Sequence, residues 1–276
     1  MCSAVNRDGT AIVTGANVGL GYACAERIKE LRPDWTLVLA CRSREKAEAA
    51  AARLKSGGAG SNIVVMDLDL ASLDSVRRFA KEVAASGLPP VRALVCNAGI
   101  QIISETSYVD GGIETTFAIN HLGHFLLANL LLRDLAPAAR IVFVASGTHD
   151  PKKKTGIPHP RYPSALLVAK PETDPAHGGD KTATAGKRRY STSKLCNVYC
   201  TYEMARRLKT IGSEITVTAF DPGLMPGTDL VRDYNPVVRF LWYHVLPRLT
   251  FLHRNIHSMR HSGAALADLA VDPKFD

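Results

Sequence analysis

Short apolar runs rich in β-forming residues alternate with helical patterns along the chain, and this alternation constrains the fold more than any other feature. The runs lie at 11–14, 36–40, 63–67, 93–96, 141–145 and 215–219. Helical patterns separate them at 21–31, 44–54, 73–85, 114–135 and 190–208. Strands buried on both faces and joined by helices form right-handed units of a parallel sheet. Because 46% of the 276 residues are hydrophobic, we expect one α/β domain over residues 1–276, a doubly wound parallel sheet with helices on both faces.

A glycine-rich segment follows the first predicted strand directly. It reads TGANVGLG from Thr14 to Gly21, and the first predicted helix begins at its end. Glycines at such a junction permit a tight turn and let the backbone approach a pyrophosphate, whose charge the helix N-terminus favours. The spacing is GxxxGxG rather than GxGxxG. Its position between strand and helix predicts a dinucleotide-binding domain of the Rossmann type.

Two segments interrupt the alternation. Residues 149–187 are rich in proline, glycine and charge, and we interpret them as a long insertion, a kind of loop that is usually functional or mobile. Residues 235–259 carry apolar side chains at helical spacing around Pro247, which predicts two short amphipathic helices. This apolar, arginine-rich segment suits a lid over an apolar substrate or a peripheral contact with an anionic membrane, and both uses can coexist.

The charge and the cysteine content limit which partners and which cellular compartment we expect for the protein. The formal net charge of +8 is concentrated in residues 151–190 and 234–262, so we interpret it as solvated loops or an anion-binding surface and expect no nucleic-acid partner. The six cysteines lack metal-type spacing, the N-terminus lacks a signal pattern, and no apolar run approaches the roughly 20 residues of a membrane span. We expect a cytoplasmic protein. We interpret His253, His257 and His261 as a solvated helix face and predict no metal site.

Six motifs in a fixed order make the chain resemble the short-chain dehydrogenase/reductase family. They are TGANVGLG, Asn97-Ala98-Gly99, Asn120 in INHLGHF, Ser146, the pair Tyr190 and Lys194, and Asp221-Pro222-Gly223. The resemblance spans about residues 11–228 and implies a bound nicotinamide dinucleotide. It implies cofactor contacts at Thr14, Gly15, Asn17, Gly19, Leu20, Arg42, Asp69, Leu70, Asn97, Ala98, Gly99, Tyr190, Lys194, Pro222 and Gly223.

The end of the second predicted strand bears on which cofactor binds. Members of the short-chain dehydrogenase/reductase family that use NAD carry an acidic residue there, whereas this chain has Cys41-Arg42-Ser43. No carboxylate would repel a 2′-phosphate, and Arg42 could grip one in a bidentate manner. The sequence therefore favours NADP(H). Asp69 matches the position that family members place beside the adenine, with Asp67 as its competitor.

Four residues would carry the chemistry that the resemblance implies. Hydride delivery to a carbonyl creates an alkoxide that needs a proton, and Tyr190 is the expected donor. One helical turn away, the Lys194 ammonium should lower the pKa of Tyr190 from its ordinary value of about 10 and hold the nicotinamide ribose. Ser146 should hydrogen-bond the substrate oxygen, and Asn120 should support a water-linked proton path through Lys194.

Within the family, the chain looks most like the branch of light-dependent protochlorophyllide reductases and retinol-dehydrogenase-like enzymes. CRSREKAEAA, LVCNAG and YSTSKLCN carry this likeness, as does the long gap between Ser146 and Tyr190. In protochlorophyllide reductases a cysteine implicated in catalysis follows the proline-glycine pair, where this chain has Leu224. Family members usually add a seventh strand after the helix expected at 261–269, so we expect either a six-stranded sheet or a clipped sequence.

Three functions remain open at this point. The favoured one is NADPH-dependent reduction of a bulky apolar carbonyl, or the reverse oxidation of an alcohol. The second is light-driven reduction of a ring C=C bond, with Tyr190 protonating carbon; Leu224 argues against it. The third is a non-catalytic NADP-binding module whose basic insertion is an interaction surface; the intact Ser146, Tyr190 and Lys194 set argues against it. Monomer and homo-oligomer are both open, and a fold does not fix a substrate.

Overall fold

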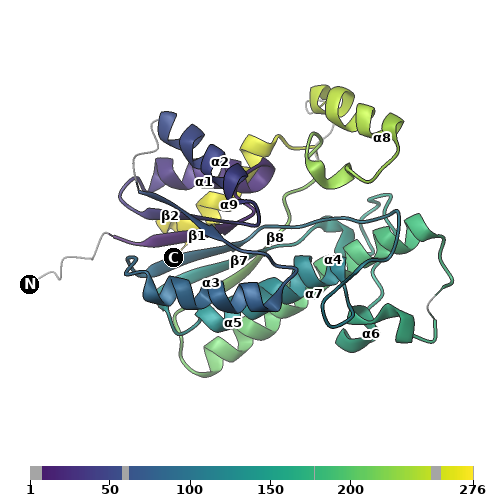
Figure 1. The fold of residues 1–276 in the computed structure, drawn as a ribbon, viewed down its shortest axis with the longest axis horizontal. Coiled ribbons are helices and arrows are strands. Elements are labelled where there is room, and N and C mark those ends of the chain that lie inside the picture. The colour runs from purple at the N-terminus through teal and green to yellow at the C-terminus, as the bar shows by residue number, and fades with distance from the viewer. Residues whose placement is uncertain (1–7, 58–61, 177, 250–255, 276) are drawn as a thin grey trace, which may run out of the picture.

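A six-stranded sheet forms the centre of the computed structural model, which describes residues 8–57, 62–176, 178–249 and 256–275 (Figure 1). The strands are β1 (Thr10–Thr14), β2 (Thr36–Cys41), β3 (Ile63–Asp67), β4 (Val91–Cys96), β7 (Leu135–Val144) and β8 (Thr216–Phe220). They lie in the order β3-β2-β1-β4-β7-β8, and every pair is parallel. The order reverses between β1 and β4, and ligands of such sheets bind at this switch point, outside the carboxyl ends of the strands. The predicted doubly wound α/β fold is confirmed.

Helices cover both faces of the sheet. Helices α1 (Gly19–Leu31), α2 (Arg44–Ser56) and α9 (Met259–Val271) lie on one face, and α3 (Leu73–Ala85), α5 (Gly123–Leu131) and α7 (Thr182–Thr210) lie on the other (Figure 1). Successive side chains of β1 enter different cores: Ala11 and Val13 pack on the α1 side, and Ile12 on the α3 side. Helices α1 and α9 approach closely at Gly263, where a Cβ would lie 2.5 Å from the Cβ of Ala23.

The helix predicted at 114–135 and the strand predicted at 141–145 have wrong boundaries. The helical region is divided into α4 (Thr115–Phe117), a π-helical turn η1 (Ala118–Leu122) and α5, and β7 already begins at Leu135. A register shift against β4 between Val91 and Ala93, together with a positive φ of 57° at Ala138, lets residues 135–139 join the sheet irregularly. An apolar run reveals only the regular part of such a strand.

The long insertion is shorter than predicted because α7 begins at Thr182, so Tyr190 lies inside the helix rather than at its start. The remainder contains the 3-10 turn η2 (Gly147–His149), the short helix α6 (Ala165–Ala169) and the 3-10 turn η3 (Pro171–Thr173). Arg161 pairs with Asp174. A hollow of about 530 Å³ separates the insertion from the start of α7. The small antiparallel pair β5 (Tyr108–Val109) and β6 (Ile113–Glu114) lies apart from the main sheet.

The segment after β8 projects from the body as a helical run (Figure 1). After the 3-10 turn η4 (Asp229–Val231) come α8 (Pro236–Phe240), a π turn η5 (Leu241–Val245) and a 3-10 turn η6 (Leu246–Leu249). Helical structure is thus confirmed from Pro236 to Leu249, and residues 250–255, including His253, lie outside the described residues. The second predicted helix is wrong at residues 256–258, where Ile256 forms a β-bridge with Leu224 and the His257 amide donates to the Leu224 carbonyl oxygen, so His257 does not lie on a helix face. The described helices include none that is long and apolar enough to cross a membrane.

Candidate active site

The glycine-rich loop between β1 and α1 has the shape that a pyrophosphate requires. Gly15 and Gly19 have φ angles of 64° and 62°, in the left-handed region that favours glycine. A Cβ at Gly21 would lie 2.4 Å from the Gly15 carbonyl oxygen, so the loop can fold this tightly only with glycine there. Val18 precedes the first turn of α1 without a side-chain cap. The N-terminal amides of this helix are therefore suited to an anionic ligand.

Two residues that the sequence did not single out support this loop. The buried thiol of Cys41, at the end of β2, has its pKa raised by burial, while hydrogen bonds from the backbone amides of Ala16, Asn17 and Gly15 act in the opposite direction. Arg53 of α2 donates from Nη2 to the Asn17 carbonyl oxygen at 3.1 Å. These contacts fix the path of the loop between the two helices.

The region beside the end of β2 carries an uncompensated guanidinium. Arg42 is exposed and makes no ion pair within the described part of the chain. Asp67 does not neutralise the charge of Arg42, because Asp67 pairs instead with Arg44, which donates to Asp67 Oδ2 at 3.0 Å. Asp69, the residue expected beside the adenine, is half-buried and accepts from the Ala71 amide at 3.0 Å. A 2′-phosphate next to Arg42 would thus meet positive charge.

A buried network joins the end of β1 to the loop after β4. The hydroxyl oxygen of Thr14 accepts from the amides of Asn97 at 2.9 Å and Ala98 at 3.0 Å. His124 Nδ1 lies 3.2 Å from the Asn120 carbonyl oxygen and so must donate to it, which leaves Nε2 to accept from the Thr14 hydroxyl at 2.9 Å. Burial lowers the pKa of His124 to about 3, so this histidine is neutral. It packs in the core.

The π-helical turn η1 exposes the main chain of Asn120 for this network. A π turn interrupts the regular ladder of helical hydrogen bonds and often marks a functional site. Here the Asn120 carbonyl oxygen also accepts from Asn197 Nδ2 at 3.1 Å. The Asn120 side chain donates to the Ile100 carbonyl oxygen at 2.9 Å and to Ser193 Oγ at 3.0 Å. Asn120 therefore links the loop after β4 to α7, the helix that carries Tyr190.

Lys194 and Asn120 converge behind Gly99. A Cβ at Gly99 would lie 3.4 Å from Asn120 Oδ1 and 3.5 Å from Lys194 Nζ. Lys194 donates to the Val144 carbonyl oxygen at 2.9 Å, and Asn197 Nδ2 donates to the same oxygen at 3.2 Å. Lys194 is buried, and desolvation lowers its pKa to about 8, although the Asp221 carboxylate raises it somewhat.

Ser146, Tyr190 and Lys194 meet at the carboxyl end of β7. Tyr190 is only 6% exposed, and Lys194 Nζ lies 5.7 Å from the centre of its ring. Burial raises the pKa of Tyr190 to about 12, and a hydrogen bond with Ser146 acts in the opposite direction. The expected lowering of the Tyr190 pKa by Lys194 is not found: the causes of the shift do not include Lys194, whose ammonium donates to the Val144 carbonyl oxygen.

The loop after β8 closes the site from the side of α9. The Pro222 carbonyl oxygen accepts from Ser262 Oγ at 2.8 Å, and Gly223 has a φ of 74°. Although burial raises the pKa of Asp221, the Lys153 ammonium at 2.9 Å and the Gly223 amide hold it below its ordinary value. Asp221 is thus a charged group near Tyr190 and Lys194 that the sequence marked only as part of a motif.

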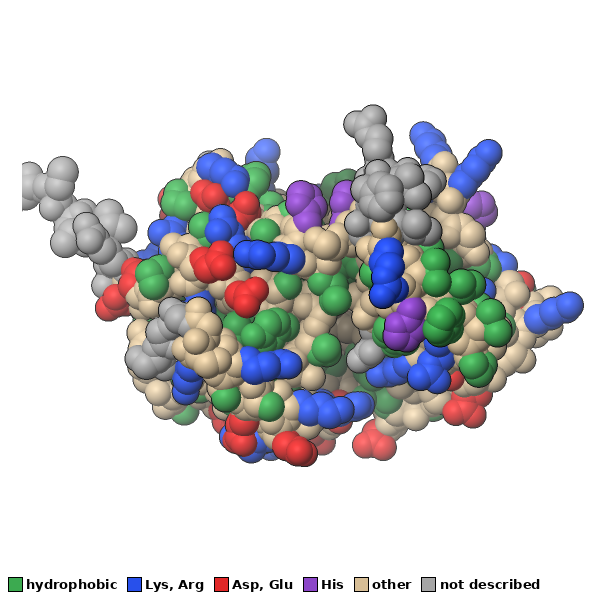
Figure 2. All heavy atoms as spheres, turned by 90° about the horizontal axis from the view of Figure 1, so that it is seen from above, with side chains coloured by type: hydrophobic (Ala, Val, Ile, Leu, Met, Phe, Trp, Pro, Cys, Tyr) green, Lys and Arg blue, Asp and Glu red, His purple; other side chains and the backbone are tan. Residues whose placement is uncertain are grey.

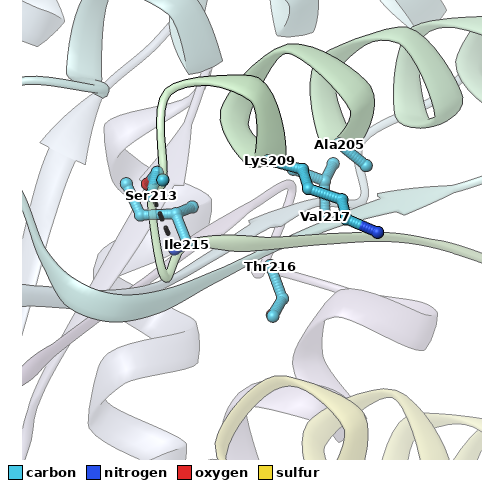
Figure 3. A pocket seen from close by; sticks show the side chains of 7 residues that line it. Ala205, Lys209, Ser213, Ile215, Thr216 and Val217 are labelled. Carbon is cyan, nitrogen blue, oxygen red and sulfur yellow. Dashed lines mark hydrogen bonds between the residues drawn. The ribbon is translucent and has the colours of Figure 1, made fainter.

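A separate cavity of about 440 Å³ lies at the opposite end of the sheet (Figure 3). It is enclosed by the end of α7 and the start of β8, including Lys209, Ser213 and Thr216, and Ser213 Oγ accepts from the Ile215 amide at 3.2 Å. Because the predicted site residues gather at the carboxyl ends of the strands, this cavity is not part of their site. Among the described residues, no group of three or more His, Cys, Asp or Glu side chains could hold a metal ion.

A dinucleotide cradle at the switch point of a parallel sheet, with a buried tyrosine and lysine and a half-buried serine beside it, defines a class of protein: an α/β oxidoreductase that uses a nicotinamide cofactor. The family described as short chain dehydrogenase matches residues 9–158. The chain belongs to the short-chain dehydrogenase/reductase family.

Known relatives place the chain near one group of enzymes. Protochlorophyllide reductase A of Oryza sativa subsp. japonica is 34% identical over 280 residues, which cover 98% of this chain and 70% of that protein. Protochlorophyllide reductase A of Arabidopsis thaliana is 34% identical over 282 residues, which cover 98% and 67%. Both names describe the proteins as chloroplastic. The cytoplasmic location predicted for this chain stays a prediction.

Solved structures of low sequence identity share the fold. A blue fluorescent protein from a metagenomic library, in complex with NADPH, matches with a TM-score of 0.68 and 22% identity over 97% of this chain and 92% of that chain. A short chain dehydrogenase from Burkholderia cenocepacia J2315, in complex with NADP, matches with a TM-score of 0.68 and 21% identity over 99% and 94%.

Proposed function

We propose that this chain is an NADP(H)-dependent oxidoreductase that transfers a hydride between the nicotinamide and a bulky apolar carbonyl or alcohol, with Tyr190 exchanging the proton. The observation that carries this proposal is the hydrogen bond between half-buried Ser146 and buried Tyr190, beside Lys194. When bound, the cofactor supplies or accepts the hydride. Ser146 orients the substrate oxygen, and Tyr190, protonated well above neutral pH, delivers a proton to it.

In this proposal Lys194 and Asn120 help to return protons to Tyr190, and Lys194 also positions the cofactor. The Lys194 ammonium can turn from the Val144 carbonyl oxygen to a ribose hydroxyl, because Asn197 continues to donate to that carbonyl. Hydrogen bonds to the Ile100 carbonyl oxygen and to Ser193 Oγ hold the Asn120 side chain in place near Lys194. A water relay through Asn120 would then return protons to Tyr190 by way of Lys194.

NADP(H) is favoured over NAD(H) by the charge next to β2. Arg42 lacks an acidic partner among the described residues, and Arg44 occupies the nearby Asp67 carboxylate. Neighbours of the same fold include complexes with NADPH, NADP and NAD, so the preference rests on the charge at Arg42. The glycine loop, Asp69, Leu70, Asn97, Pro222 and Gly223 would complete the cofactor site.

A second candidate is the protochlorophyllide-type reduction of a C=C bond. It is favoured by the 34% identity to protochlorophyllide reductases over nearly the whole chain. In this reaction Tyr190 would protonate carbon after hydride transfer. Leu224 stands against it, because it follows Pro222-Gly223 where the resemblance to protochlorophyllide reductases implies a cysteine, and it offers no proton or thiolate.

The test is NADPH oxidation by the whole chain with three substrates: 2-naphthaldehyde, all-trans-retinal, and protochlorophyllide in the dark and under illumination. Turnover of an aldehyde in the dark supports the carbonyl reaction, and turnover of protochlorophyllide only under illumination supports the second candidate.

Tyr190→Phe should lower turnover at least ~100-fold and leave NADPH binding unchanged. Full turnover of this variant would refute the role of Tyr190. Arg42→Ala should weaken NADPH binding but not NADH binding; an equal effect on both would refute the cofactor preference.

A further inference from the structure

A second polar cluster lies beside the catalytic tyrosine and is not used by the proposed reaction. It consists of Gln101 from the loop after β4, Lys187 from α7 and Tyr234 from the segment after β8. The Tyr234 hydroxyl donates to Gln101 Oε1 at 3.1 Å, and Lys187 Nζ lies 5.2 Å from the centre of the Tyr234 ring. Burial is the main cause of the raised pKa of Tyr190, and Tyr234 adds to it, which places the two phenols near each other.

The three segments are fixed against one another by specific contacts. Asp233 accepts from the backbone amides of Ile103 at 2.7 Å and Ser104 at 2.8 Å, which ties the segment after β8 to the loop after β4. Gly186 permits the start of α7 to touch the same loop, since a Cβ there would lie 2.4 Å from the Ile102 carbonyl oxygen. The position of Lys187 relative to Gln101 is therefore set by the fold.

One group in this cluster is buried without a hydrogen-bond partner, and another is a cation that no acidic side chain neutralises among the described residues. Gln101 is 2% exposed, and its Nε2 is buried without a hydrogen-bond partner. An amide left in this state costs free energy that an acceptor would recover. No acidic side chain in the described part of the chain pairs with Lys187. Both groups are donors, one of them charged, so the missing ligand is an anionic acceptor.

The cluster also has a defined position relative to the reaction. Lys187, Tyr190 and Lys194 are spaced i, i+3 and i+7 on α7 and so share one face of the helix. The rise of an α-helix separates Lys187 from Tyr190 by about 4.5 Å along the axis. A group bound by Lys187 thus lies about one helical turn beyond the atom that Tyr190 protonates, in the direction of the helix N-terminus.

We propose that Lys187 and Gln101 form a subsite for a carboxylate on the substrate, so that the enzyme selects apolar substrates that carry an acid group away from the reacting atom. The inference rests on the proposed function for the position of the reacting end. One carboxylate oxygen accepts from the Lys187 ammonium and the other from Gln101 Nε2. Because Gln101 Nε2 is buried, binding requires the half-buried Tyr234 ring to move aside.

Ligand binding to the NADPH-loaded protein tests the subsite without requiring turnover. The probes are 2-naphthoate and its methyl ester, which share the ring system and differ in charge. Isothermal titration should show that wild-type protein binds the carboxylate about tenfold more tightly than the ester. Lys187→Met should abolish this preference by weakening carboxylate binding alone, and Gln101→Leu should reduce it. Lys181→Met, which removes an exposed lysine just before the same helix, is the control for net charge and should keep the preference.

The outcomes separate the subsite from the reaction. Equal affinity of the wild-type protein for acid and ester, or a preference that survives Lys187→Met, overturns the subsite. If Lys181→Met also abolishes the preference, general electrostatic attraction explains it and the subsite is refuted. If the preference depends on Lys187 and Gln101 but 2-naphthaldehyde is not reduced, the subsite stands and the proposed carbonyl reaction fails.

Discussion

Lys194 occupies an environment that favours its neutral form. Desolvation by the surrounding core lowers its pKa from the ordinary 10.5 to about 8. Because the folded-state pKa lies below the unfolded one, the unfolded chain binds this proton more tightly than the folded protein does. The contribution of Lys194 to stability is therefore fully present above pH 10.5 and is lost as the pH falls through about 8. At neutral pH the protein holds a buried ammonium at a cost to its stability, a common feature of functional sites.

Lys194→Met should stabilise the protein at pH 7, because it removes this buried charge while Asn197 continues to donate to the Val144 carbonyl oxygen. One pKa unit corresponds to about 1.4 kcal/mol, so the gain in free energy of unfolding is at most about 3 kcal/mol. Urea denaturation at several pH values measures it. The difference between variant and wild type should narrow as the pH rises from 8 toward 10.5; a difference independent of pH would contradict the assignment of a low pKa to Lys194.

At the scale of structural elements, one hydroxyl joins three of them. Thr14 ends β1, its oxygen accepts from two amides of the loop after β4, and it donates to His124 of α5. His124 in turn donates to the main chain of the π turn that carries Asn120. The glycine-rich loop and α7 are thus linked through Asn120 by hydrogen bonds among buried and half-buried groups.

Thr14→Val should lower the free energy of unfolding by about 3 kcal/mol, because it keeps the shape of the side chain but leaves the Asn97 and Ala98 amides without an acceptor. Thr14→Ser retains the hydroxyl and loses only a methyl group, at a cost of about 1 kcal/mol. Chemical denaturation of both variants checks the difference. If Thr14→Ser proved as unstable as Thr14→Val, packing of the methyl group rather than the hydrogen bonds would explain the effect.

The elements that the sequence predicted best are those with a regular apolar period. The strands from β1 to β4 and the helices α1, α2 and α3 were predicted within a few residues, because each buries one face or two faces of a regular structure. The π turn at Asn120 was missed, since one inserted residue in a helix leaves no trace in an apolar pattern. The early start of α7 was also missed, because residues 182–189 have no regular apolar period and are held by contacts such as the ion pair of Arg188 with Asp180.

Some residues of the candidate site could be predicted from the sequence, and others could not. Gly15, Ser146, Tyr190 and Lys194 could be selected because their order along the chain is shared with a family. Gln101 could not, since its significance lies in a hydrogen bond to Tyr234 far away in the sequence and in an amide that lacks a partner. Only the folded chain brings such residues together.

At the scale of the whole molecule, the segment 236–249 has an amphipathic surface that the body of the protein leaves open. Val237, Phe240 and Leu241 are 68%, 59% and 44% exposed and lie at i, i+3 and i+4, on one face of the helical run. The chain has no acidic residue between 234 and 262. Figure 2 shows apolar and basic side chains gathered where this segment faces the viewer, on its right-hand side. An amphipathic helix of this composition favours the interface of an anionic membrane.

We propose that this segment acts both as a lid and as a membrane contact. Trp242 donates from its indole nitrogen to the Thr228 carbonyl oxygen at 2.9 Å, which ties the helical run to the loop that leaves the active site. Insertion of the apolar face into a membrane would hold the run in one position relative to that loop. An apolar substrate dissolved in the membrane would then reach the site without crossing water.

We therefore expect the protein to sediment with vesicles that contain anionic phosphatidylglycerol and to remain in the supernatant with vesicles of phosphatidylcholine alone. Phe240→Ser should lower the bound fraction, because each large apolar side chain that leaves the interface removes about 2 kcal/mol of burial. Phe275→Ser is the matched control: Phe275 is 48% exposed, but it lies near the end of the chain after α9. Equal binding to both kinds of vesicle, or equal loss in both variants, would exclude a specific membrane contact through this segment.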